Sequence, residues 1–203
     1  MAGHARSDRD LAFERARAEA AVCRDCPLYR DATQVVFGEG PVPAKLMLLG
    51  EQPGDKEDRA GHPFVGPAGA LLDAALAEGG IPRDDVYVTN AVKHFKWVRG
   101  HGKVRIHKSP LRSEVVACSQ WWQRELELVA PKVLVCLGAV AAKAVLGPSV
   151  KITEVRGHVV QRLDVAVVPT LHPAAVLRGA DRRNELRADL VSDLSVAADL
   201  LRA

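Results

Sequence analysis

The most basic stretch of the chain is the segment KVRIHK, residues 103–108. Seven Lys or Arg residues and no Asp or Glu lie between positions 93 and 112. Side chains alternate between the two faces of an extended segment, so we expect Lys103, Arg105 and His107 on one face. A local cationic stripe is typical of a protein that binds a phosphate backbone, although charge alone favours a solvated surface loop. The candidate backbone contacts are Lys103, Arg105 and Lys108.

Four cysteines form a second candidate group, Cys23, Cys26, Cys118 and Cys136. Cys23 and Cys26 belong to a C-x-x-C motif, whose two thiolates can converge on one metal centre. Disulfides are disfavoured in a reducing cytosol, so metal binding explains an even number of cysteines better there. Taken alone, Cys118 and Cys136 are typical of buried apolar cysteines. The spacing leaves both zinc and an iron–sulfur cluster open.

Further candidates follow predicted strands or lie in loops rich in glycine and proline. Glu51, in GEQPG, is a candidate base or a stabiliser of positive charge, or else part of a solvated acidic turn. His172 is a candidate hydrogen-bond donor to a developing anion, or else a buried structural histidine. Asn90 can read an amide-like edge and Phe64 can stack on a base; a turn residue and a core side chain are the alternatives. The loop that contains Glu51 also contains two further candidate substrate-binding residues, Gln52 and Asp55.

The elements that must position these residues alternate between strand and helix. Short apolar runs at 45–50, 86–90, 132–138 and 165–170 predict strands buried on both faces. Helices are expected at 10–21, 70–80, 113–130, 139–147 and 184–201, the third of them starting at an N-cap Ser113. We expect an α/β fold of three layers, α/β/α, with a central, mostly parallel, four-stranded sheet. The carboxyl ends of those strands would then bring the candidate loops together.

Composition indicates one soluble globular domain over residues 1–203. The chain has 48% hydrophobic and 26% charged residues and a net charge of +3. Without the seven clustered cations, 21 cations face 25 acids, a net charge of −4. An apolar run of the roughly 20 residues that a membrane span needs is lacking, as is the apolar stretch of a secretory signal. We therefore expect a cytoplasmic protein without a membrane contact.

Several motifs in order resemble a known family over nearly the whole chain. GEQPG, PFVGPAG, VTNAVK and HPAAVLR, with CRDC near the N-terminus, resemble the family-4 uracil-DNA glycosylases. The resemblance implies a uracil-DNA glycosylase-like fold and a [4Fe–4S] cluster held by the four cysteines. It implies that Phe64 stacks on an extruded uracil, Asn90 reads its Watson–Crick edge and His172 hydrogen-bonds its O2 oxygen. Arg178, in VLRG, would fill the gap left by the base or hold the backbone.

The basic segment resembles one branch of this family. Its KVRIH is similar to the KRRIH motif of the UdgX branch, with Val104 in place of an arginine. In that branch the histidine of the motif attacks the sugar C1′ and stays bonded to it, which gives His107 that role. Glu51 would orient the imidazole or take its proton. We expect the missing arginine to weaken a phosphate contact rather than the positioning of His107, because Lys103, Arg105 and Ile106 remain.

Three functions therefore compete. The first is a uracil-DNA glycosylase that traps itself on the DNA through His107, and the second is a turnover glycosylase in which Glu51 or Asp55 orients water. The third is an iron–sulfur protein that only binds nucleic acid. We expect a monomer acting on uracil-containing DNA, with single strands favoured because base extrusion costs least there.

Overall fold

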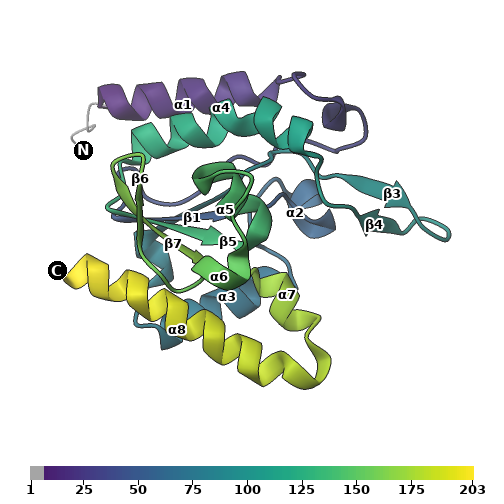
Figure 1. Ribbon diagram of the computed structural model, residues 1–203. Coiled ribbons are helices and arrows are strands. Elements are labelled where there is room, and N and C mark those ends of the chain that lie inside the picture. Colours follow the sequence, from purple (N-terminus) through teal and green to yellow (C-terminus); the bar gives the residue numbers. More distant parts are fainter. Residues whose placement is uncertain (1–6) are drawn as a thin grey trace, which may run out of the picture.

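A five-stranded sheet forms the centre of the computed structural model, which describes residues 7–203 (Figure 1). Its strands, in spatial order, are β2 (Val86–Asn90), β1 (Leu46–Gly50), β5 (Val133–Leu137), β7 (Val165–Thr170) and β6 (Val160–Arg162). The first four are parallel and lie where the apolar runs predict them. The prediction of four strands is wrong by one, because β6 pairs antiparallel with β7. Three partly exposed residues leave no apolar pattern to reveal it.

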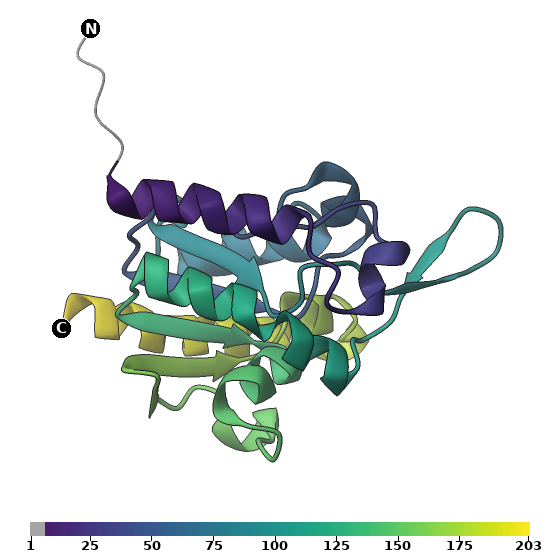
Figure 2. The same cartoon turned by 90° about the horizontal axis from the view of Figure 1, so that it is seen from above.

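Helices cover both faces of this sheet, so the predicted three-layer architecture is confirmed (Figures 1 and 2). One layer contains α1 (Asp8–Ala21), α4 (Arg112–Val129), α5 (Gly138–Leu146) and α6 (Ile152–Val155). The other contains α3 (Pro67–Glu78), α7 (Pro173–Leu177) and α8 (Arg183–Arg202). Single-turn 3₁₀ helices lie at Pro27–Arg30, Arg83–Asp85 and Ala180–Arg182. No helix of the described part is long and apolar enough to cross a bilayer.

The continuous apolar strands are explained by burial on both faces. In β1, Leu46 and Leu48 belong to the core shared with α3 and α8, whereas Met47 and Leu49 belong to the core shared with α4 and α5. Because successive side chains point to opposite faces of the sheet, the residues that face each of the two cores must be apolar. The carboxyl ends of the parallel strands are thereby fixed at one edge.

Three local expectations are corrected. The loop predicted after β1 contains a short helix, α2 (Asp55–Ala60). The third predicted helix begins at Arg112 instead of after Ser113, where the Glu114 carboxylate accepts a hydrogen bond of 2.6 Å from the Leu111 backbone N–H. The basic segment forms an antiparallel hairpin of β3 (Trp97–Arg99) and β4 (Arg105–His107).

A buried ion pair joins the end of β2 to α4. Lys93 is 1% exposed and Glu125 is 0% exposed, and Lys93 Nζ lies 2.5 Å from Glu125 Oε2. Lys93 also donates to Thr89 Oγ1 and to the Asn90 carbonyl. The other donors to the Glu125 carboxylate are the Tyr87 hydroxyl, the Thr89 hydroxyl and the Gly38 backbone N–H. The pair is therefore fully hydrogen-bonded, the condition under which buried charges are tolerated.

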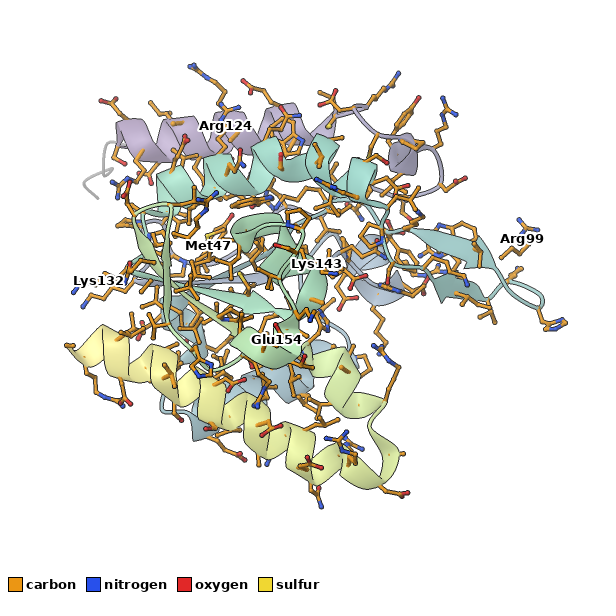
Figure 3. All side chains as sticks on the ribbon, viewed as in Figure 1. Met47, Arg99, Arg124, Lys132, Lys143 and Glu154 are labelled. Atoms are coloured by element: carbon orange, nitrogen blue, oxygen red, sulfur yellow. The ribbon has the colours of Figure 1, made fainter. Side chains whose placement is uncertain are left out.

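Replacing one partner of this pair should destabilise the fold strongly. Glu125→Ala leaves the Lys93 ammonium buried without its counter-ion, at a cost of about 3 to 5 kcal/mol. The matched control is Glu154→Ala, which removes the exposed Lys151–Glu154 pair and should cost about 0 to 1 kcal/mol (Figure 3). Urea unfolding monitored by circular dichroism measures both. Equal destabilisation by the two variants would contradict the role of the buried pair.

Candidate active site

A small pocket of about 100 Å³ lies beyond the carboxyl ends of the parallel strands. Among its lining residues are five of the predicted site residues, Gln52, Phe64, Asn90, His107 and His172. They come from the loops after β1, β2 and β7, from the segment before α3 and from the end of β4. The structure thus brings together side chains that are up to 120 positions apart in sequence.

Two backbone features shape the pocket around Phe64. Phe64 itself has a positive φ of 57°, and its ring lies 6.2 Å from the His172 ring at an interplanar angle of 27°. Gly50 ends β1 where a Cβ atom would lie 2.3 Å from Asn90 Oδ1 and 2.7 Å from Phe64 Cζ. Any larger residue at position 50 would therefore displace the aromatic ring and the amide.

Glu57 joins the two loops on either side of the pocket. Its carboxylate accepts hydrogen bonds of 3.1 Å from the Gly54 backbone N–H and 2.7 Å from the Gly66 backbone N–H. Glu57 and Asp58 are buried, so the interpretation of the acidic run as a solvated turn is wrong for both. The signal that sequence reasoning missed is the helical spacing of DKED, which places these acids on the inner side of α2.

Three polar atoms at the carboxyl ends of β1 and β2 are buried without a hydrogen-bond partner among the described residues, and two of them belong to residues that line the pocket. They are Glu51 Oε1, Gln52 Oε1 and Asn90 Oδ1. Leaving such a group unpaired costs about 1 to 3 kcal/mol, and protein interiors rarely tolerate it. Their grouping at the ends of β1 and β2 is therefore typical of a site that a polar ligand completes.

The His172 side chain is held as a neutral hydrogen-bond donor. Its Nδ1 accepts a 3.1 Å hydrogen bond from the Ala174 backbone N–H at the start of α7. The proton of the neutral ring must therefore be on Nε2. Burial, reinforced by the charges of the nearby Arg178 and His107, lowers the pKa of His172 to about 4. At neutral pH the ring has an Nε2–H donor and no charge.

The His107 ring lies at the base of the hairpin beside Gln52. The two Nε2 atoms are 2.9 Å apart, which suits donation from the amide to an unprotonated His107 Nε2. Burial lowers the pKa of His107; Glu51 opposes this shift and Arg178 reinforces it. The imidazole is therefore neutral at neutral pH, with a lone pair available for chemistry.

Gln52 also closes the hairpin at its base. Its Nε2 lies 3.2 Å from the Lys96 carbonyl and 3.1 Å from the Lys108 carbonyl, just before β3 and just after β4. The two N–H groups of the amide are therefore shared among these carbonyls and His107 Nε2. The Lys108 backbone N–H donates to the Lys96 carbonyl at 3.0 Å. One buried side chain thereby fixes both ends of the segment that contains His107.

The Arg105 side chain points inward and binds carboxylates of the protein, whereas the sequence predicted that it contacts flanking phosphates. Its side chain is 10% exposed and forms ion pairs with Asp55 and, at 2.6 Å, with Asp58 on α2. The guanidinium also lies 5.2 Å from the centre of the Phe95 ring and 5.5 Å from that of Trp97. Arg105 therefore locks the hairpin onto α2, a positioning role for His107.

Asp55 takes part in the same lock. Arg59 and Arg105 both bind its carboxylate and lower its pKa. The structure thus places Asp55 among ion pairs, and it is not among the residues that line the pocket.

The remaining hairpin cations face solvent. Of the seven clustered cations, Lys93 pairs with Glu125, Lys96 with Glu114 and Arg105 with Asp55 and Asp58. The other four, Arg99, Lys103, Lys108 and Arg112, are exposed and form no ion pair with another described residue. The same holds for Arg178, whose charge acts on both histidines. The hairpin projects from the body, with Arg99 near its far end (Figures 2 and 3).

The cysteines separate into two groups. Cys23, Cys26 and Cys118 belong to one buried cluster, and the charges of Cys23 and Cys26 reach Cys118. Cys136 lies on β5 inside a different apolar cluster, and burial alone raises the pKa of its thiol. The described residues contain no group of three or more His, Cys, Asp or Glu side chains arranged to hold a metal ion. The expected set of four cysteine ligands is therefore not brought together, and Cys136 is the one that stands apart.

Comparison with known proteins identifies the family. A model of the uracil DNA glycosylase superfamily matches residues 37–195. The chain belongs to this superfamily. The matched superfamily region begins before β1 and ends within α8, so it includes every element that contributes a side chain to the pocket.

Curated superfamily members cover most of the chain. The Type-4 uracil-DNA glycosylase of Thermotoga maritima is 38% identical over 182 residues, 89% of this chain and 90% of the relative. The Type-4 uracil-DNA glycosylase of Sulfurisphaera tokodaii is 35% identical over 186 residues, 87% of this chain and 81% of the relative. A Type-5 uracil-DNA glycosylase of Pyrobaculum aerophilum is 32% identical over 152 residues, 66% of this chain and 63% of the relative.

The separation of the cysteines predicts different effects of two substitutions on metal content. Cys118→Ala should lower the iron content and the visible absorbance of protein purified without oxygen, because it removes a thiol that neighbours Cys23 and Cys26. Cys136→Ala, the matched control, should leave both signals unchanged. Loss of iron in a folded Cys136→Ala protein would contradict this placement.

Proposed function

We propose that the protein is a uracil-DNA glycosylase that excises uracil and retains the sugar on His107. The Type-4 relatives support the glycosylase activity, and the KVRIH segment supports the UdgX branch. The observation that carries the finer proposal is that His107 lines the same small pocket as Phe64, Asn90 and His172. A neutral imidazole at that place can reach a sugar whose base occupies the pocket.

The pocket residues account for base recognition. Asn90, with an unpaired buried Oδ1, can accept from and donate to the Watson–Crick edge of an extruded uracil. Phe64 offers a ring for stacking. When the N-glycosidic bond breaks, its electron pair moves to the base, and the His172 Nε2–H can stabilise the negative charge that develops on O2. These interactions strengthen in the transition state, as catalysis requires.

His107 accounts for the trapped product. Its lone pair forms a bond to C1′ as the bond from C1′ to uracil breaks, and the imidazolium then loses its N–H proton to a base. Glu51 is the candidate base, because its charge acts on His107 and its Oε1 is unpaired. The Nε2 atom is 2.9 Å from the Gln52 amide, so attack through Nε2 requires that this hydrogen bond be released.

The exposed position of Val104 is compatible with a role of His107 in bond formation, although the UdgX motif has arginine at this position. Val104 is 59% exposed near the tip of the hairpin, whereas Arg105 makes the lock onto α2. The arginine that the UdgX motif has at position 104 would therefore face solvent. Its absence removes one cation available to phosphate and leaves the positioning of His107 intact.

A turnover glycosylase is the alternative, and the names of the Type-4 relatives fit it at least as well. Glu51 is then the residue that orients water, because Asp55 is engaged by Arg59 and Arg105. A protein that only binds DNA would release no uracil and form no adduct. In all three cases Lys103, Lys108 and Arg178 are proposed to contact DNA.

The proposal also includes an iron–sulfur cluster, the cellular location, the oligomeric state and the preferred form of DNA. Cys23, Cys26 and Cys118 would supply thiolates to a [4Fe–4S] cluster, and Cys136 does not fit that set. Burial raises the pKa of Cys118 to about 12, so cluster binding must displace its proton. A cluster there would tie the segment after α1 to α4. We propose a cytoplasmic monomer that favours single-stranded DNA.

A denaturing gel distinguishes the competing functions. Wild-type protein mixed with a single-stranded oligonucleotide containing one uracil should give a shifted band that survives heat and detergent. His107→Ser should abolish the band, because serine lacks the imidazole lone pair that forms the bond to C1′, whereas Lys103→Gln should keep it. Alkali-labile abasic sites without a stable band would support the turnover glycosylase and would contradict the role of His107.

The lowered pKa of His107 predicts the pH dependence of adduct formation. Only the neutral imidazole attacks, so the rate should stay on its plateau as pH falls through 6.5, the ordinary value, and decline only below it. Arg178→Gln removes a positive charge that lowers this pKa, so its acid limb should move to higher pH. Single-turnover rates across pH test both statements. A wild-type midpoint above 6.5 would contradict the lowered pKa of His107.

A further inference from the structure

A second groove runs along one face of α4 and α5, on the side of the molecule away from α8. It has a volume of about 650 Å³, far larger than the active-site pocket. Positions 112, 115, 116, 119 and 123 of α4 form one wall, following the helical repeat. Positions 140, 143 and 144 of α5 form part of the other, and Arg162 of β6 lies at the groove as well.

The groove is positively charged and contains no carboxylate. Three cations line it, Arg112, Lys143 and Arg162, and all three are exposed. None of them forms an ion pair or a side-chain hydrogen bond with another described residue. Lys96, before α4, and Arg124, on α4, are paired with Glu114 and Glu19, whereas the three groove cations keep their charge available to a ligand.

The groove is continuous with the proposed DNA contact. Its lining begins at Pro110, three residues after His107 and two after Lys108. Arg112 at the start of α4 and Lys143 on α5 both line the groove; Figure 3 labels Lys143. A strand held at His107 could therefore pass directly from the hairpin into this groove.

We propose that this groove, which we call the α4/α5 groove and define by Arg112, Lys143 and Arg162, binds the single strand that flanks the uracil on one side. The inference rests on the proposed function, because it places the uracil at His107. The cations would contact phosphates, and the Gln123 amide offers hydrogen-bond donors between them. The apolar floor, including the exposed Val116, offers contact area to sugars and bases.

The chemistry favours a nucleic-acid backbone over an acidic protein. A polyanion with regularly spaced phosphates satisfies several separated cations at once and releases counter-ions from its whole length. The adjoining hairpin already adds Lys103 and Lys108 to the same path. An acidic partner protein is the competing occupant, and it would leave the affinity for DNA independent of these three residues.

The test is fluorescence anisotropy of uracil-free single strands at several salt concentrations. The variant is the triple substitution Arg112→Gln, Lys143→Gln and Arg162→Gln, and strands of roughly 5 and roughly 25 nucleotides are compared. The matched control removes three exposed cations elsewhere, Arg9→Gln, Arg15→Gln and Lys132→Gln, with the same change in net charge. Circular dichroism verifies that both variants fold.

The groove variant should lose affinity for the long strand by tenfold or more at low salt, and the slope of log K against log salt should shrink by about 2, or about 0.7 for each of three lost contacts. The control variant should change both the affinity and the salt slope only slightly. Identical binding by the two variants would overturn the proposal. Uracil release by the wild type is measured in parallel: its absence would refute the proposed function, whereas release with equal binding would refute the groove alone.

Discussion

The buried ion pair between Lys93 and Glu125 joins the end of β2, which contains Asn90, to helix α4. Lys93 follows β2 by three residues and binds the Asn90 carbonyl, while Glu125 comes from the middle of α4. The same carboxylate reaches Tyr87, Thr89 and Gly38, so one charge is shared by the sheet, a helix and a loop. Since each group has a partner, the end of β2 has a single allowed position, and Asn90 is presented from a rigid base.

The basic segment serves two purposes that its charge alone does not separate. Its inner cations, at positions 93, 96 and 105, are neutralised by carboxylates and fix the hairpin to the body. Its outer cations, at positions 99, 103 and 108, remain free to act on a polyanion. Residues 93–112 therefore contribute both to the stability of the fold and to the attraction of DNA. The positive field that this segment adds outside the protein is weaker than its seven cations imply, and it comes from the projecting hairpin and the start of α4.

The strands and the grouping of site residues were predictable from sequence, because long apolar runs and strand-end loops obey local rules. Asn90 and His172 converge because parallel strands place their carboxyl ends together, and the loops that follow β1 and β2 bring Phe64 and His107 to the same edge. The role of Arg105 was not predictable, since its partners Asp55 and Asp58 are about fifty positions away and acids in a loop are normally solvated. For the same reason, Glu57 and the isolation of Cys136 depend on tertiary packing that no local pattern encodes.

The way in which Gln52 holds the hairpin has an evolutionary consequence. Its amide binds the main-chain carbonyls of Lys96 and Lys108 and contacts no side chain of the residues at the tip. Main-chain groups are common to all residues, so the stretch between these anchors can be lengthened, shortened or rewritten while its two ends stay in register. The hairpin can in this sense be exchanged while Gln52, which anchors its two ends, stays unchanged. New chemistry at the sugar can thus arise by replacing one surface loop, with the base-reading pocket left unchanged.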